Sequence, residues 1–216
     1  MKKAICFLFL LAAARTQAQS ANQVLGSSLS HYVFEQFLSG KVYLRSGEVS
    51  ERKLNYNALT REMIFEENGQ PMAIANPENV DSVVIVGHRF IPADKKFYEW
   101  IAGNSYPVFA EYVCAVQEEG VSSGYGSSSN TSASNTMKSL HGNGTVYAMK
   151  LPDDFKVNTK VAYYLYKDNK YHPIKNLQQL SKLVPAKKDV IQAWVKEHNT
   201  DFSKREQLQL LIAQIQ

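Results

Sequence analysis

Residues 62–74 read EMIFEENGQPMAI and decide the fold that the sequence predicts. The apolar residues Met63-Ile64-Phe65 lead into Asn68-Gly69, and Met72-Ala73-Ile74 follow. Asn-Gly is the dipeptide best suited to a type I′ turn, because both central residues of that turn need a positive φ. The stretch therefore predicts a β-hairpin, two antiparallel strands joined by a tight turn.

The same pattern continues on both sides of this hairpin. From residue 37 to residue 171 the apolar residues mostly recur with period two between turn signals, which is the signature of β-strands. Further strands are predicted at residues 42–44, 83–86, 98–102, 107–116, 145–151 and 161–166. Gly103-Asn104 and Asp168-Asn169 are the clearest of the other turn signals. The chain is therefore expected to form a succession of hairpins.

The apolar period changes to that of helices after Pro173. Leu177, Leu180 and Val184 are spaced three and four apart behind Asn176, a good N-cap, and Pro185 ends this first helix. Ile191, Trp194 and Val195 mark a second helical stripe.

A third helix is predicted near the C-terminus. Ser203-Lys204-Arg205-Glu206 fits a capping box, in which the serine and the glutamate satisfy each other's free backbone amides. One apolar face follows, formed by Leu208, Leu211, Ile212 and Ile215.

Strands first and helices afterwards predict an α+β fold, an antiparallel β-rich body of successive hairpins followed by a small C-terminal three-helix appendage. Parallel pairing would require helices interleaved among the strands. The expected organisation is a signal peptide at 1–18, a β-rich domain at 19–173 with a Gly/Ser-rich loop at 120–144, and the helical appendage at 174–216.

The first 18 residues have the pattern of a secretory signal peptide. Met1-Lys2-Lys3 precedes about eleven apolar residues, and Thr16-Gln17-Ala18 places small residues before a cut after Ala18. The apolar run is shorter than the roughly 20 residues that a membrane-spanning helix needs, so no transmembrane segment is expected in the mature chain.

Cleavage removes three of the 24 basic residues and leaves 21 against 20 acidic ones, a net charge of +1. A nucleic-acid partner is therefore not expected.

The mature chain keeps a single cysteine, Cys114, so an intramolecular disulfide is excluded. Cys114 alternates with Ala110, Tyr112 and Val116 along one face of a predicted strand. We interpret it as a buried small apolar residue.

Ser122 is the candidate that favours an enzyme. It lies in Gly120-Val121-Ser122-Ser123-Gly124, a GxSxG pattern, with acidic residues and histidines later in the chain as partners: Asp153, Asp154, Asp168, His141 and His172. A nucleophile elbow passes straight into a helix, however, and the Gly- and Ser-rich residues that follow Ser122 form helices poorly. The alternative, which we favour, is a polar loop with or without a binding role.

Other residue types give no catalytic or metal constellation. The histidines at 31, 88, 141, 172 and 198 lack metal-ligand spacing, and the acidic pairs at 66–67, 118–119 and 153–154 sit on adjacent residues, which point to opposite faces of a strand. No catalytic, cofactor-binding or metal-binding residue is assigned.

Tyrosine is enriched, with Tyr164 and Tyr166 on one strand face, and such a face either binds a glycan or protein or packs internally. The stripe from Leu208 to Ile215 either docks on a partner or, as we favour, caps the β-body.

Several longer stretches resemble an uncharacterised family of exported envelope proteins of Gram-negative bacteria. They read GKVYLRSGEVSERKLNYNALTREMIF, NPENVDSVVIVGHRFIP, KFYEWI, SGYGSSSNTSA and QQLSKLVPAKKDVIQAWVKEHNTDFSKREQLQLLI. The resemblance implies a periplasmic or surface location and no assigned activity. The sequence thus predicts a non-enzymatic exported binding or structural protein of the cell envelope, with an unknown protein or glycan as partner and no cofactor. The alternative is a small serine hydrolase that uses Ser122.

Overall fold

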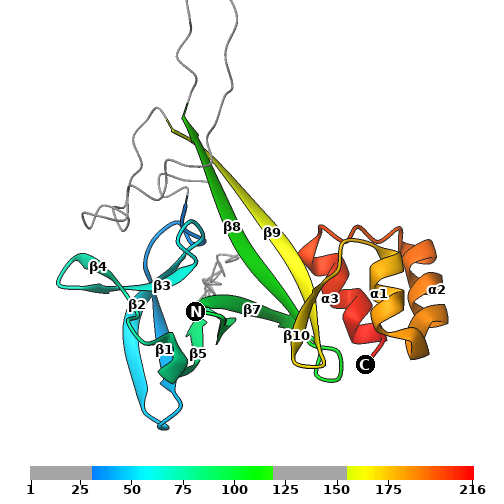
Figure 1. Ribbon diagram of the computed structural model, residues 1–216, viewed down its shortest axis with the longest axis horizontal. Coiled ribbons are helices and arrows are strands. Elements are labelled where there is room, and N and C mark those ends of the chain that lie inside the picture. Colours follow the sequence, from blue (N-terminus) through cyan, green and yellow to red (C-terminus); the bar gives the residue numbers. More distant parts are fainter. Residues whose placement is uncertain (1–30, 119–154) are drawn as a thin grey trace, which may run out of the picture.

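The computed structural model describes residues 31–118 and 155–216, in which ten antiparallel strands form one sheet (Figure 1). The strands are β1 (Leu38–Leu44), β2 (Val49–Asn57), β3 (Glu62–Glu67), β4 (Gln70–Ala73), β5 (Val80–Ile85), β6 (His88–Ala93), β7 (Lys96–Ala102), β8 (Val108–Glu118), β9 (Phe155–Lys167) and β10 (Lys170–Pro173). Their order in the sheet is β10-β9-β8-β7-β6-β5-β1-β2-β3-β4. The predicted α+β class with successive hairpins is confirmed.

Turn residues join neighbouring strands as the sequence predicts. Asn68 and Gly69, between β3 and β4, have φ values of 53° and 77°, and Asp168 and Asn169, between β9 and β10, have 50° and 57°. These positive values fit the two-residue turns that match the twist of antiparallel strands. Among the connections that the structure describes, the one after β4 departs from the hairpin series, because it leads through the short 3-10 helix η1 (Pro77–Asn79) to β5, which pairs with β1.

The sheet curls so that its inner face, the one that carries Leu54, Tyr56 and Phe90, encloses most of the core. Tyr56 of β2 packs against rings from three distant strands, with ring-centre distances of 5.6 Å to Phe90, 6.5 Å to Phe97 and 6.3 Å to Tyr112. The backbone amide of Cys114 in β8 also donates to the carbonyl of Ala58, just after β2, at 3.0 Å. Cys114 is buried on this face, as predicted.

Three helices follow the last strand: α1 (Leu177–Leu183), α2 (Lys188–His198) and α3 (Arg205–Gln214), with the 3-10 turn η5 (Pro185–Lys187) between the first two. In Figure 1 they lie together beside the paired strands β8 and β9, on the side away from β1–β4. Their apolar residues join the core of the sheet and are fully or almost fully buried: Leu180, Val184, Ile191, Leu208, Leu211, Ile212 and Ile215. The stripe on α3 therefore caps the inner face. No helix in the described ranges is long and apolar enough to cross a membrane.

The caps of the helices agree with the sequence at α1 and differ at α3. Asn176 is the N-cap of α1, and its side chain accepts from the amide of Gln179 at 3.0 Å. The capping box predicted for residues 203–206 is wrong, because α3 begins at Arg205 and Lys204 is its N-cap without a side-chain cap. Ser203 instead donates to Asp201 at 2.7 Å. The first residue of the helix, Arg205, donates hydrogen bonds to Glu99 of β7 in the sheet.

Candidate functional site

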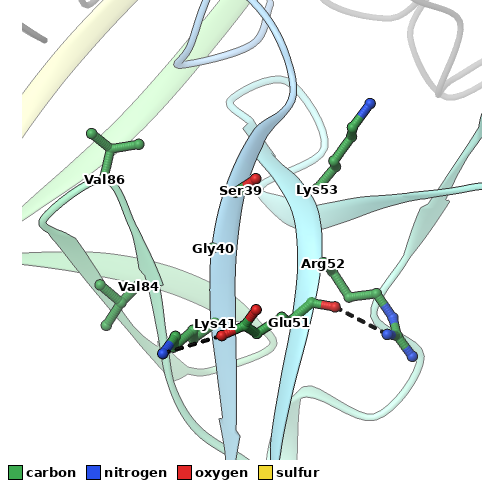
Figure 2. Close-up of a pocket in the computed structure, with 8 residues that line it drawn as sticks. All are labelled: Ser39, Gly40, Lys41, Glu51, Arg52, Lys53, Val84 and Val86. Atoms are coloured by element: carbon green, nitrogen blue, oxygen red, sulfur yellow. Dashed lines mark hydrogen bonds and ion pairs between the residues drawn. The ribbon is translucent and has the colours of Figure 1, made fainter.

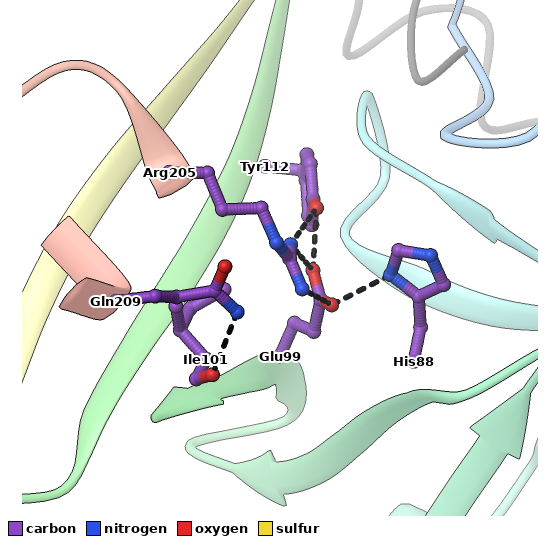
Figure 3. A network of polar contacts seen from close by, with 6 residues as sticks. All are labelled: His88, Glu99, Ile101, Tyr112, Arg205 and Gln209. Atoms are coloured by element: carbon purple, nitrogen blue, oxygen red, sulfur yellow. Dashed lines mark hydrogen bonds and ion pairs between the residues drawn. The ribbon is translucent and has the colours of Figure 1, made fainter. Parts of the chain in front are cut away.

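A buried carboxylate lies between the sheet and α3. Glu99 of β7 is fully buried, and four donor groups surround its two oxygens (Figure 3). The guanidinium of Arg205 donates to both, with Nη1 2.7 Å from Oε2 and Nη2 2.5 Å from Oε1. The hydroxyl of Tyr112 donates to Oε2 at 2.5 Å, and Nδ1 of His88 lies 2.7 Å from Oε1.

Register explains why these residues meet. Glu99 is opposite Phe90 in β6 and Ala110 in β8, so His88 and Tyr112, two positions farther along, share its inward-facing side. Arg205 arrives from the first turn of α3. One turn later Gln209 donates to the carbonyl of Ile101 at 3.1 Å, a second polar tie between α3 and β7.

The electrostatics of this network favour fixed charges. Burial would raise the pKa of Glu99, but the hydrogen bonds from His88 and Arg205 outweigh it and lower that pKa to about 2. Burial, reinforced by the Glu99 charge, raises the pKa of Tyr112 well above its ordinary value. Burial would lower the pKa of the Arg205 guanidinium, but the hydrogen bond and the charge of the Glu99 carboxylate outweigh this effect and raise that pKa. Because neither Glu99 nor Tyr112 exchanges a proton near neutral pH, these two groups are structural partners of Arg205 and would be a poor acid–base pair.

This network predicts a specific pH dependence of stability. A carboxyl whose pKa is lower in the folded than in the unfolded chain stabilises the fold fully above its unfolded pKa, here 4.5, and this contribution is lost as the pH falls toward 2. The difference corresponds to roughly 3 kcal/mol. We expect urea unfolding to show that loss between pH 5 and pH 2. The Glu99→Gln variant should be less stable at every pH, and the part of the pH dependence that comes from Glu99 should be absent from it. If the free energy of unfolding of this variant falls with pH as steeply as that of the unmodified protein, the prediction is wrong.

The opposite, outer face of the sheet carries the enriched tyrosines. Tyr98 and Tyr171 stack with ring centres 4.0 Å apart, and Phe109 lies 5.3 Å from Tyr171. Tyr164 and Tyr166 share this face, as predicted, and remain half-buried, whereas Tyr98 and Phe109 are buried. The rings therefore cover one another in a second small core. This is internal packing, one of the two alternatives that the sequence allowed for the tyrosine-rich face.

A second buried carboxylate borders the tyrosines and is also paired. Lys96 donates to Glu111 at 2.7 Å, and Arg61 lies 3.4 Å from the same oxygen. The ammonium of Lys96 also lies 4.8 Å from the centre of the Tyr98 ring. Burial would raise the pKa of Glu111, but the hydrogen bond from Lys96 and the other nearby groups lower it. This cluster holds the outer face together.

Two surface grooves formed by the described residues are candidate ligand sites. The first, of about 460 Å³, crosses the outer face over β1 and β2 (Figure 2). Four of its eight lining residues are charged, and two of them pair within it, since Lys41 lies 3.2 Å from Glu51. The second, which we call the open-end groove, has about 470 Å³ and an apolar floor at the β1–β4 end of the inner face, with Leu44, Phe65 and Ile74 half-buried in it.

The residues singled out in the sequence do not form a site within the described part. Ser122, His141, Asp153 and Asp154 lie outside the described residues, as does the predicted strand at 145–151. Asp168 is exposed in a turn, and Nε2 of His172 lies 3.2 Å from the carbonyl of Lys167. The chain from 31 to 118 and from 155 to 216 contains no cluster of His, Cys, Asp or Glu suited to a metal.

The sequence did not predict that Glu99, Arg205 or the open-end groove would form a site. One signal was present, because Glu99 lies between Phe97 and Ile101 at a position where the strand alternation expects an apolar residue. Comparison with known protein families, characterised proteins and solved structures found no significant match to this chain.

Proposed function

We propose that this chain is a non-enzymatic binding protein of the bacterial cell envelope, exported after loss of residues 1–18, and that its ligand site is the open-end groove. The observation that carries the proposal is the unequal covering of the inner face. Helices α1–α3 cover one end and bury the apolar residues there, whereas Leu44, Phe65 and Ile74 stay half-buried over a groove of about 470 Å³ at the other. That volume is within the usual range for small-molecule sites, which are concave and mostly apolar.

The state of the buried polar residues supports binding over catalysis. Glu99 and Glu111 are the buried carboxylates of the described residues, and each is held by cationic side chains. The thiol of Cys114 is buried, which raises its pKa to about 11 and makes it a weak nucleophile at neutral pH. The serine hydrolase alternative needs Ser122, which lies outside the described residues, with His141 or His172.

Native mass spectrometry of the mature protein, purified from the periplasm without denaturation, tests this function. We expect a noncovalent small molecule that is released on unfolding. Ala75→Trp should remove it, because Ala75 is an exposed lining residue of the groove and an indole there occupies the space. Val49→Trp, at an exposed position of β2 outside the groove, is the matched control and should retain the ligand.

The competing hydrolase is tested on the same sample with a fluorophosphonate probe. We expect no covalent labelling. Labelling that Ser122→Ala abolishes, together with no releasable ligand, would overturn the binding function and favour the hydrolase.

A further inference from the structure

We propose that the open-end groove binds the acyl chain of a fatty acid, with the carboxylate head at Arg52. This inference rests on the proposed function and adds the chemical class of the ligand. The floor of the groove consists of Val42, Leu44, Phe65, Ile74 and Val80, all apolar. Four are aliphatic, so the floor suits a flexible hydrocarbon chain better than a polar sugar ring.

The polar residues of the groove are exposed, apart from the half-buried Ser50 opposite Val42. Arg52 is exposed, donates only from Nη1 to the carbonyl of Glu51 at 3.0 Å, and forms no ion pair with another residue that the structure describes. Its remaining N–H groups are therefore available to a carboxylate, for which the planar guanidinium is the best-suited partner. Asn76 and Asn79 add amide groups at the same rim.

Glu67 is the one acidic residue at this rim. Because Lys53 pairs with Glu66 in the β2–β3 ladder, Arg52 and Glu67 are neighbours on the two strands and share the inner face. No ion pair joins them in the structure's described part. A bound carboxylate would therefore compete with Glu67 for Arg52, and removing the Glu67 charge should strengthen fatty-acid binding.

An added peptide strand is a poor occupant of this end of the sheet. β4 is the edge strand beside the groove, but it has only four residues and contains Pro71. A short edge with proline offers few backbone hydrogen bonds to an incoming strand. The groove is therefore better suited to a small amphiphile than to β-strand addition.

Titration of the isotope-labelled mature protein with decanoate, followed by methyl and amide NMR, tests this inference. We expect saturable one-to-one shifts at Val42, Leu44, Ile74 and Val80. Octanoate should bind about fifteenfold more weakly than decanoate, from about fourfold per buried methylene. Arg52→Gln should weaken decanoate about fivefold and Glu67→Gln should tighten it about twofold, as exposed ion pairs are worth little. Ala75→Trp should abolish binding, and Val49→Trp should leave it unchanged.

Three results would overturn the fatty acid as ligand. They are shifts centred away from the groove, equal affinity for octanoate and decanoate, and equal binding of decanoate and 1-decanol in the unmodified protein. If any of these occurs while native mass spectrometry still shows a groove-dependent small molecule, the binding function stands and only the ligand class fails. If neither decanoate nor any other releasable molecule occupies the groove, both fail.

Discussion

Arg205→Ala is expected to lower the free energy of unfolding by about 3 kcal/mol near neutral pH, because it leaves the charge of Glu99 buried without its cationic partner. The bidentate bonds at 2.7 Å and 2.5 Å are lost together. His88 and Tyr112 remain near the carboxylate, which keeps the loss at the lower end of the usual range for a broken buried pair. The measurement is the shift of the urea midpoint at constant slope.

Two further variants separate the ion pair from a general effect of changing α3. Arg205→Lys keeps the charge but cannot form the two parallel bonds, so its loss should be intermediate. Lys204→Ala removes an exposed cation one residue earlier and should change stability by less than about 0.5 kcal/mol. Equal losses for Arg205→Ala and Lys204→Ala would show that Glu99 does not depend on this partner.

The sequence predicts the strands and turns well because their signals are local. Asn68-Gly69 and Asp168-Asn169 specify turns through the positive φ of their own residues. Asn176 likewise caps α1 through the amide of a residue three positions away. Such features depend on a few consecutive residues and need no knowledge of the tertiary fold.

The site could not be predicted because its contacts are distant in sequence. Glu99 and Arg205 are separated by 106 residues, and the floor of the groove comes from β1, β3, β5 and the segment after β4. The capping box failed for the same reason: Arg205 binds the carboxylate of Glu99, and α3 begins at this residue. Tertiary contacts here override a local cap that is worth about 1 kcal/mol.

Packing of α3 explains why the two ends of the inner face differ. Gln216, at the C-terminus, accepts from the amides of Asn104 and Ser105 at 2.8 Å and 3.0 Å, so the helix is held at its far end as well as at Arg205. Among the described residues, the β1–β4 end has only the short η1 nearby, and Leu44, Phe65 and Ile74 remain half-buried there. In the described part of the chain the helices therefore close one end of the inner face, and the other end carries the groove that we propose as the ligand site.

Truncation of residues 174–216 is expected to abolish cooperative folding, because it uncovers Ile101, Val108 and Leu165 and leaves Glu99 without Arg205. Loss of the thermal transition and of near-ultraviolet circular dichroism would be the observation. A folded truncated β-body that no longer captures an envelope partner would instead favour the reading in which the tail is a docking element.

A single pair of neighbouring leucines tests the same capping role without truncation. Leu211 is fully buried on α3, whereas Leu210 is 60% exposed on its other side. Leu211→Ala should cost about 3 kcal/mol, since it removes buried methyl groups and leaves a cavity. Leu210→Ala changes the same chemistry one residue away and should stay within about 0.5 kcal/mol. Equal effects in urea unfolding would mean that the buried stripe of α3 is not what stabilises the sheet, because only its burial distinguishes the two positions.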